Sequence, residues 1–219
     1  MEVVASRIYS QKLRGKWVFI SASFPAPDRA REYFQSANPF RITDATIAAA
    51  RAIFGASGGV LFGGHPTISP LVLSVGREFL SDFDEDQRPY VLIFQSKVFE
   101  ERIPDETVAL VREGIGKMVW VEADPGGREE SLRRLRVAML ERGPVAGIFI
   151  GGMEGVYREG DSKSEFYMFR DICKGCPAYP LGTTGGASAI LLQKLAEKKE
   201  RIGWKWKHVK FEELARPGA

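Results

Sequence analysis

The sequence predicts an α/β fold: a Rossmann-like, open and mostly parallel sheet of about six strands with helices on both faces. Six short apolar runs alternate along the chain with segments of helical period, an order typical of a parallel sheet. The runs are continuously apolar instead of alternating with polar residues, which indicates strands buried on both faces. Glycines or small polar residues follow most of the runs, as expected for loops that lead from strands into helices.

The strands are expected in chain order, and the sixth carries the weakest signal. Pro180 lies within it and cannot donate a ladder hydrogen bond, so this strand is expected at an edge or at a strand end. The predicted strands are residues 17–20, 59–62, 90–94, 118–121, 145–150 and 178–181.

Helices are expected between the strands. Residues 128–141 place Leu132, Leu135 and Met139 on one stripe, and most of the arginines of this segment fall off it. Capping residues predict where two other helices begin. We expect one helix from Asp44 with Thr43 as its N-cap, another from Pro70 with Ser69 as its N-cap, and a further one over residues 188–199.

Composition limits the classes of protein that the chain can belong to. Of its 219 residues, 44% are hydrophobic and 27% are charged, which is ordinary globular usage and excludes disorder as the main state. The net charge of +3 does not indicate a nucleic-acid-binding protein. No apolar run is long enough to span a membrane, and no secretory signal or disulfide framework is expected. We therefore expect a cytoplasmic protein with one domain over residues 1–219, a core over about 17–195 and a C-terminal appendage over 201–219.

A ligand site is expected where the parallel strands end, because ligands of such sheets bind outside the carboxyl ends of the strands. Glycine pairs follow the second, fifth and sixth runs, and serines follow the first. The candidate ligand-binding residues are Ser21, Ser23, Gly63, Gly64, His65, Thr67, Gly151, Gly152, Met153, Glu154, Gly155, Thr183, Thr184, Gly185 and Gly186.

The glycine pairs have a physical reason to bind phosphate. Glycine lets the backbone approach a ligand and adopt positive φ, and successive N–H groups before a helix form a concavity that binds anions. The alternative for any single pair is a tight turn without a ligand. Three pairs at corresponding strand ends favour one shared, phosphate-receptive cleft. None of the loops matches the glycine fingerprint of dinucleotide-binding folds or the P-loop of nucleoside triphosphatases.

Three stretches of the sequence resemble the SLOG superfamily, and most closely its cluster from bacterial conflict systems. They are Phe62–Leu71, Ile150–Val156 and Pro180–Ala187, and the resemblance spans about residues 17–195. The resemblance implies a Rossmann-like fold and a nucleotide-like ligand. The superfamily includes LOG enzymes, which cleave the N-glycosidic bond of nucleoside monophosphates, DprA-type DNA-binding proteins, and sensor domains that bind nucleotide or NAD-derived signals in anti-phage defence.

The first hypothesis is therefore a homo-oligomeric sensor of a nucleotide or ADP-ribose-like signal in bacterial stress or defence, with no cofactor and with a possible separate effector protein. The second is a nucleotide N-glycosidase or deoxyribosyl transferase. DNA binding comes third because the charge balance disfavours it.

An enzyme would need a carboxylate near the sugar. The LOG pattern PGGxGTxxE corresponds to Gly151–Glu159 here, with Ile150 in place of the proline, so Glu154 and Glu159 are the candidate catalytic residues. Glu165 is explained instead as part of a capping box with Ser162. His65 is expected to face the ligand, although a loop histidine bonded to backbone remains the alternative.

Two further motifs are interpreted as structural. Cys173 and Cys176 form a CxxC pair at the expected end of a helix, and too few soft donors remain for zinc, so no metal is expected. Residues 204–211 alternate aromatic with basic side chains, which suits single-stranded bases or an anionic membrane surface. A half-exposed strand or an oligomer contact is the simpler interpretation of this segment.

Overall fold

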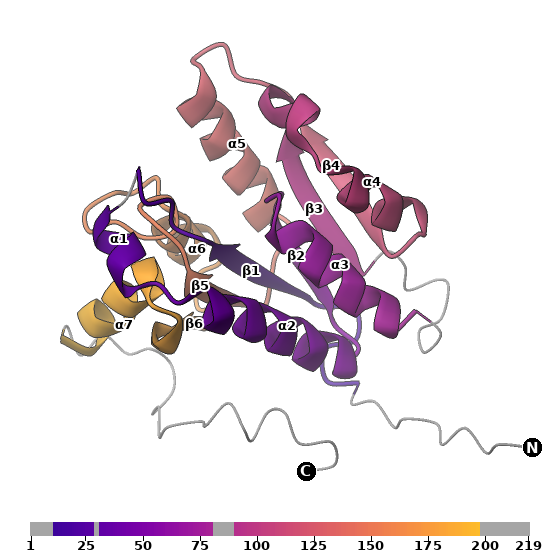
Figure 1. Ribbon diagram of the computed structural model, residues 1–219, viewed down its shortest axis with the longest axis horizontal. Coiled ribbons are helices and arrows are strands. Elements are labelled where there is room, and N and C mark those ends of the chain that lie inside the picture. The colour runs from indigo at the N-terminus through magenta and orange to yellow at the C-terminus, as the bar shows by residue number, and fades with distance from the viewer. Residues whose placement is uncertain (1–10, 29–30, 81–89, 198–219) are drawn as a thin grey trace, which may run out of the picture.

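Six parallel strands form one sheet in the computed structural model, which describes residues 11–28, 31–80 and 90–197 (Figure 1). The strands are ordered β4-β3-β2-β1-β5-β6, and every neighbouring pair is parallel. Their bounds are β1 Trp17–Ser23, β2 Gly59–Gly63, β3 Val91–Ser96, β4 Gly116–Val121, β5 Ala146–Gly151 and β6 Ala178–Leu181. All six predicted strands are confirmed, and β6 with Pro180 is an edge strand as expected.

Helices cover both faces of the sheet, and each layer has its own core. On one face, α2 Pro39–Gly55, α3 Ile68–Glu78 and α4 Asp105–Arg112 pack on Val18, Ile20 and Val60. On the other, α5 Arg128–Leu140, α6 Glu165–Ile172 and α7 Gly186–Glu197 pack on Phe19 and Phe149. The short α1, Arg31–Ser36, lies against α7 (Figure 1). The prediction of helices on both faces is confirmed.

Three predicted helix starts are wrong, and one of them is that of α7, which begins at Gly186 instead of residue 188. Helix α2 begins at Pro39, and Asn38 is its N-cap, accepting a hydrogen bond from the Arg41 N–H at 3.0 Å. Asn-Pro is a strong start because proline at the first position loses no helical hydrogen bond. Helix α3 begins at Ile68, two residues before Pro70, which the first turn tolerates for the same reason.

The order of the strands fixes where a ligand can bind. Strand β1 lies at the centre, with β2 on one side and β5 on the other, so the connections run outward in both directions from it. The loops that follow β1, β2, β3 and β5 therefore gather at one edge of the sheet, which is the expected ligand edge of such a fold. Among the described residues, no helix has both the length and the apolar character needed to cross a membrane.

Candidate ligand-binding site

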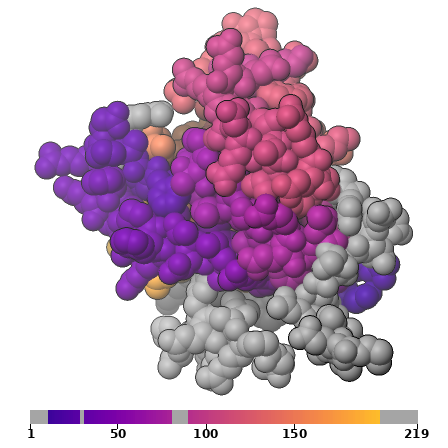
Figure 2. Space-filling model, turned by 45° about the vertical axis from the view of Figure 1, so that its right-hand side comes forward, coloured from indigo at the N-terminus to yellow at the C-terminus, as the bar shows by residue number. Residues whose placement is uncertain are grey.

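A pocket of about 130 Å³ lies over the carboxyl ends of β1, β2 and β3. Figure 2 shows a recess in the same region, between the indigo N-terminal part of the chain and the magenta and pink part. The pocket is lined by residues from β1, the end of β2 and the loop after it, β3, the 3₁₀ helix Lys97–Arg102, α5, the β5 loop and the start of α6. They are Ile20, Ser21, Ala22, Ser23, Gly63, Gly64, His65, Gln95, Phe99, Leu132, Leu135, Arg136, Val156 and Glu165.

The polar centre of this pocket consists of Ser21, Glu165 and Arg136. The Ser21 hydroxyl donates a hydrogen bond to Glu165 Oε2 at 2.6 Å, and Arg136 Nε lies 3.4 Å from Glu165 Oε1. The side chains of Arg136 and Glu165 are only 14% and 19% exposed, so this pair is better shielded than an ordinary surface ion pair. Arg136 and Glu165 lie 115 and 144 positions after Ser21 in the sequence.

Local structure explains how these side chains meet. Side chains alternate along a strand, so Ser21 faces the same layer as the buried Phe19, towards α5 and α6. Glu165 is the first residue of α6, and its N–H donates to the Gly155 carbonyl at 2.9 Å. Arg136 also donates from Nη1 to the Lys163 carbonyl at 3.0 Å, which ties α5 to the chain just before α6.

The β2 loop forms another wall and contains four of the predicted residues. Gly63, Gly64 and His65 line the pocket, whereas Thr67 is exposed and is not among its lining residues. His65 Nδ1 accepts a hydrogen bond from the Thr67 N–H at 3.2 Å, which leaves Nε2 as the donor of a neutral ring. Burial lowers the pKa of His65, so the neutral form is favoured.

The loops after β5 and β6 meet each other instead of this pocket. Thr184 Oγ1 accepts from the Gly151 N–H at 2.8 Å, and Ser188 Oγ donates to the Gly151 carbonyl at 3.1 Å. The Ala187 N–H donates to the Gly152 carbonyl at 2.9 Å. Gly151, Gly152, Gly185 and Gly186 all have positive φ and are buried. The positive φ values of these glycines therefore allow the loop after β5 and the loop after β6 to pack closely against each other.

The N–H groups of these glycines already have acceptors within the protein. They donate as follows: Gly64 to Phe94 O, Gly151 to Thr184 Oγ1, Gly152 to Ser23 O, Gly185 to Gly182 O and Gly186 to Ser36 Oγ. The sequence predicted that these glycines would offer free N–H groups to an anion, but the N–H groups of all five are already bonded within the protein. Their assignment as ligand contacts stays a prediction, and for Gly151, Gly152, Gly185 and Gly186 it concerns residues outside the pocket lining.

The remaining predicted contacts lie around that closed junction. Met153 packs partly buried against the core, Glu154 is partly exposed, and the Gly155 carbonyl holds the start of α6. Thr183 is exposed, and its carbonyl accepts a hydrogen bond from Arg41. These residues are not among those that line the pocket, so their roles also stay predictions.

Of the two candidate catalytic residues, Glu159 pairs with Lys194 of α7 at 3.1 Å, and its side chain is 51% exposed. The pairing raises the pKa of Lys194. Neither Glu154 nor Glu159 lines the pocket. The carboxylate that does is Glu165, and the capping-box interpretation of it is wrong: Ser164 is the N-cap of α6, and Glu165 points to Ser21 and Arg136.

The structure also locates the cysteines. Cys173 ends α6, and its thiol donates to the Leu140 carbonyl. Burial, with a smaller effect of Cys176, raises the pKa of Cys173 to about 11, so this thiol is a poor nucleophile. Within residues 11–28, 31–80 and 90–197, no group of three or more His, Cys, Asp or Glu side chains is arranged to hold a metal ion. The aromatic and basic segment 204–211 lies outside the described residues.

Residues 32–214 match the SLOG cluster3 family. The chain belongs to this family. The match covers most of the chain and continues past residue 201, where the sequence analysis places the start of an appendage; that expectation concerns residues that the structure does not describe. No curated protein and no solved structure matches the chain. Membership supports a nucleotide-related, Rossmann-like domain, in agreement with the parallel sheet.

Proposed function

We propose that this SLOG cluster3 protein binds a nucleotide-derived small molecule of the ADP-ribose type in the pocket over β1, β2 and β3, and acts as a sensor of it. The observation that carries the proposal is the group of Ser21, Glu165 and Arg136 within that pocket. A partly buried carboxylate beside the carboxyl end of a central parallel strand, here Glu165 at the start of α6 next to Ser21 of β1, is suited to accept hydrogen bonds from ribose hydroxyls, as acidic residues do in other nucleotide folds.

The walls of the pocket suit the rest of such a ligand. Phe99, Leu132, Leu135 and Val156 provide apolar surface on the side of α5 and the β5 loop. The volume of about 130 Å³ is below the roughly 300–1,000 Å³ that encloses a whole drug-sized ligand. The proposal is therefore that the pocket takes the nucleoside part, with phosphates or a second sugar along its open rim.

Sensing is favoured over cleavage by the composition of the pocket lining. Among the described residues that line it, Glu165 is the only carboxylate, whereas most glycoside hydrolases use two. The second candidate function is N-glycosidic hydrolysis of a nucleotide, favoured by the position of Glu165 where a ribose would lie. In that case Glu165, instead of Glu154 or Glu159, would stabilise the positively charged sugar.

Binding can be tested by titration calorimetry with AMP, ADP-ribose and ribose 5-phosphate. We expect at least one of them to bind the wild-type protein, and Glu165→Gln to weaken that binding about tenfold or more, because a charge-assisted hydrogen bond to the ribose is lost. Glu159→Gln is the matched control: it makes the same chemical change at a glutamate outside the pocket, and its affinity should equal that of wild type.

Loss of binding in Glu159→Gln with unchanged binding in Glu165→Gln would contradict the proposal. Chromatography of the same mixtures for free adenine separates the two functions. Adenine release by wild type that stops in Glu165→Gln would replace sensing with hydrolysis.

The sensor proposal extends to a cytoplasmic protein of bacterial stress or anti-phage defence in which the ligand changes a homo-oligomer contact or the contact with a separate effector. A shift between two assembly states requires that the ligand bind one state more tightly than the other. Light scattering of the protein with and without ADP-ribose measures this: a ligand-dependent change of mass is expected, and an unchanged mass at saturation would contradict the oligomer part of the proposal.

A further inference from the structure

Gln95 presents its amide to the proposed nucleotide site. It is the fifth residue of β3, it is 7% exposed, and it lines the pocket. Its carboxamide makes no hydrogen bond to the part of the chain that the structure describes. The amide atoms are not fully enclosed by the protein, so they open on the pocket and are available to pair with a group that enters it.

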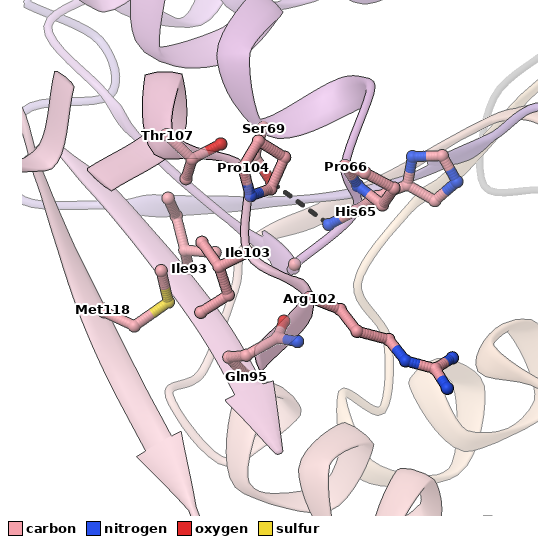
Figure 3. Close-up of a pocket in the computed structure, with 11 residues that line it drawn as sticks. His65, Pro66, Ser69, Ile93, Gln95, Arg102, Ile103, Pro104, Thr107 and Met118 are labelled. Atoms are coloured by element: carbon pink, nitrogen blue, oxygen red, sulfur yellow. Dashed lines mark hydrogen bonds between the residues drawn. The ribbon is translucent and has the colours of Figure 1, made fainter. Parts of the chain in front are cut away.

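A second, small hollow adjoins the pocket and shares Gln95 with it. Its volume is about 20 Å³, and Gly64, His65 and Gln95 line both spaces. In Figure 3 the Gln95 amide lies below the loop that carries His65 and to the left of the Arg102 side chain. The Thr107 hydroxyl, 1% exposed, also lines the small hollow and has no hydrogen-bond partner among the described residues. The hollow has room for about one water molecule.

Gly64 explains why the amide can occupy this position. A Cβ atom at residue 64 would overlap Gln95 Oε1. The Gly64 N–H donates to the Phe94 carbonyl at 2.8 Å, so the backbone of the β2 loop is held against β3 at this point. The glycine thus lets the carboxamide lie across the ends of the two strands, where it borders the pocket.

We infer that Gln95 is a specificity-determining residue of this site: its carboxamide pairs with the hydrogen-bonding edge of an adenine base whose ribose lies against Ser21 and Glu165. The inference rests on the proposed function and adds the identity of the base and its orientation. A carboxamide offers one donor beside one acceptor, which matches the 6-amino group and adjacent ring nitrogen of adenine. Phe99 also lines the pocket and supplies an aromatic face, and the Arg128 guanidinium lies 5.4 Å from its ring centre.

The experiment compares AMP with purine riboside 5′-monophosphate, which differs from AMP only in lacking the 6-amino group. Wild type should bind AMP about tenfold more tightly, because the amine pairs with the Gln95 oxygen. Gln95→Met keeps the length of the side chain and removes both polar atoms, so it should bind the two nucleotides equally. Thr107→Val is the matched control: it removes the neighbouring unpaired hydroxyl, which does not line the pocket, and should keep the tenfold preference.

Equal affinity of wild type for the two nucleotides would overturn the inference, and this result needs no variant to fold. A preference that survives in Gln95→Met, or in Gln95→Leu if the methionine variant does not fold, would overturn it too. In both cases binding itself remains, so the proposed function stands. If wild type binds neither nucleotide but binds GMP, the adenine assignment fails; if it binds no nucleotide at all, the proposed function fails with it.

Discussion

Glycines have different roles in two regions at the carboxyl ends of the strands: the pocket over β1, β2 and β3, and the junction of the loops after β5 and β6. Over β1, β2 and β3, Gly63 and Gly64 border an open pocket whose polar groups are side chains from distant elements. At the ends of β5 and β6, Gly151 and Gly185 adopt positive φ and are buried in a junction between two loops. The backbone donors of that junction are used within the protein.

This difference teaches that a glycine pair after a parallel strand has two meanings that the sequence does not separate. It can leave room for a ligand, or it can let another loop of the same chain approach. Which one applies depends on what lies opposite the missing side chain, and that is a property of the tertiary structure. The comparison predicts that glycine substitutions in the two regions will have different consequences.

The largest effect is expected from Gly185→Ala. A Cβ atom there would overlap the Ser36 carbonyl oxygen, and φ is +75°, so neither the space nor the backbone conformation suits alanine. Steric overlap with backbone and a strained positive φ together should lower the free energy of unfolding by about 3–5 kcal/mol. Urea unfolding monitored by circular dichroism measures it.

Gly63→Ala is the counterpart at the pocket. Its Cβ would lie 3.6 Å from Leu135 Cδ2, an ordinary contact, and its φ is not positive. The free energy of unfolding should change by less than about 1 kcal/mol. Equal destabilisation by the two substitutions would remove the distinction between a closed junction and an open pocket.

An effect smaller than that of Gly185→Ala is expected from Ser21→Ala, which removes the hydroxyl that donates to Glu165. Loss of a partly buried hydrogen bond to a carboxylate should cost about 1.5–3 kcal/mol of stability. Ser23→Ala makes the same change two residues later in β1, where the side chain has no hydrogen bond to the described residues, and should be nearly neutral. If both variants have the stability of wild type, Ser21 does not support Glu165.

The smallest effect concerns pH. Burial lowers the pKa of His65 below its model-peptide value of about 6.5, so the unfolded chain takes up this proton first as the pH falls. The contribution to stability is therefore fully present above about pH 6.5 and is lost as the pH falls through the folded-state pKa. His65→Asn keeps an acceptor for the Thr67 N–H but does not titrate. Urea midpoints at pH 7.5 and 5.5 should differ less for this variant than for wild type; an identical dependence would show that His65 does not contribute.

Much of the fold could be predicted from the sequence because its signals are local. Six apolar runs gave six strands, and Pro180 correctly placed β6 at an edge. Two of the helix starts were wrong because several residues compete to cap a helix: Asn38 precedes Thr43, and Pro70 fits inside the first turn of α3 as well as at its beginning.

The site could be predicted only in part. Its location at the carboxyl edge follows from topology, and Ser21 and the β2 loop line the pocket as expected. Glu165 was missed because its local signal, a serine three residues before it, also fits a helix cap. Its true partners, Ser21 and Arg136, are brought to it by the packing of α5 and α6 on the sheet.

The crystal structure of the protein with bound AMP tests the central claim most directly. The account predicts that the ribose hydroxyls lie within hydrogen-bond distance of Glu165, in the pocket over β1 and β2. A nucleotide seated instead on the loops at Gly151–Gly155 and Gly185–Gly186, with the junction between them opened, would contradict it.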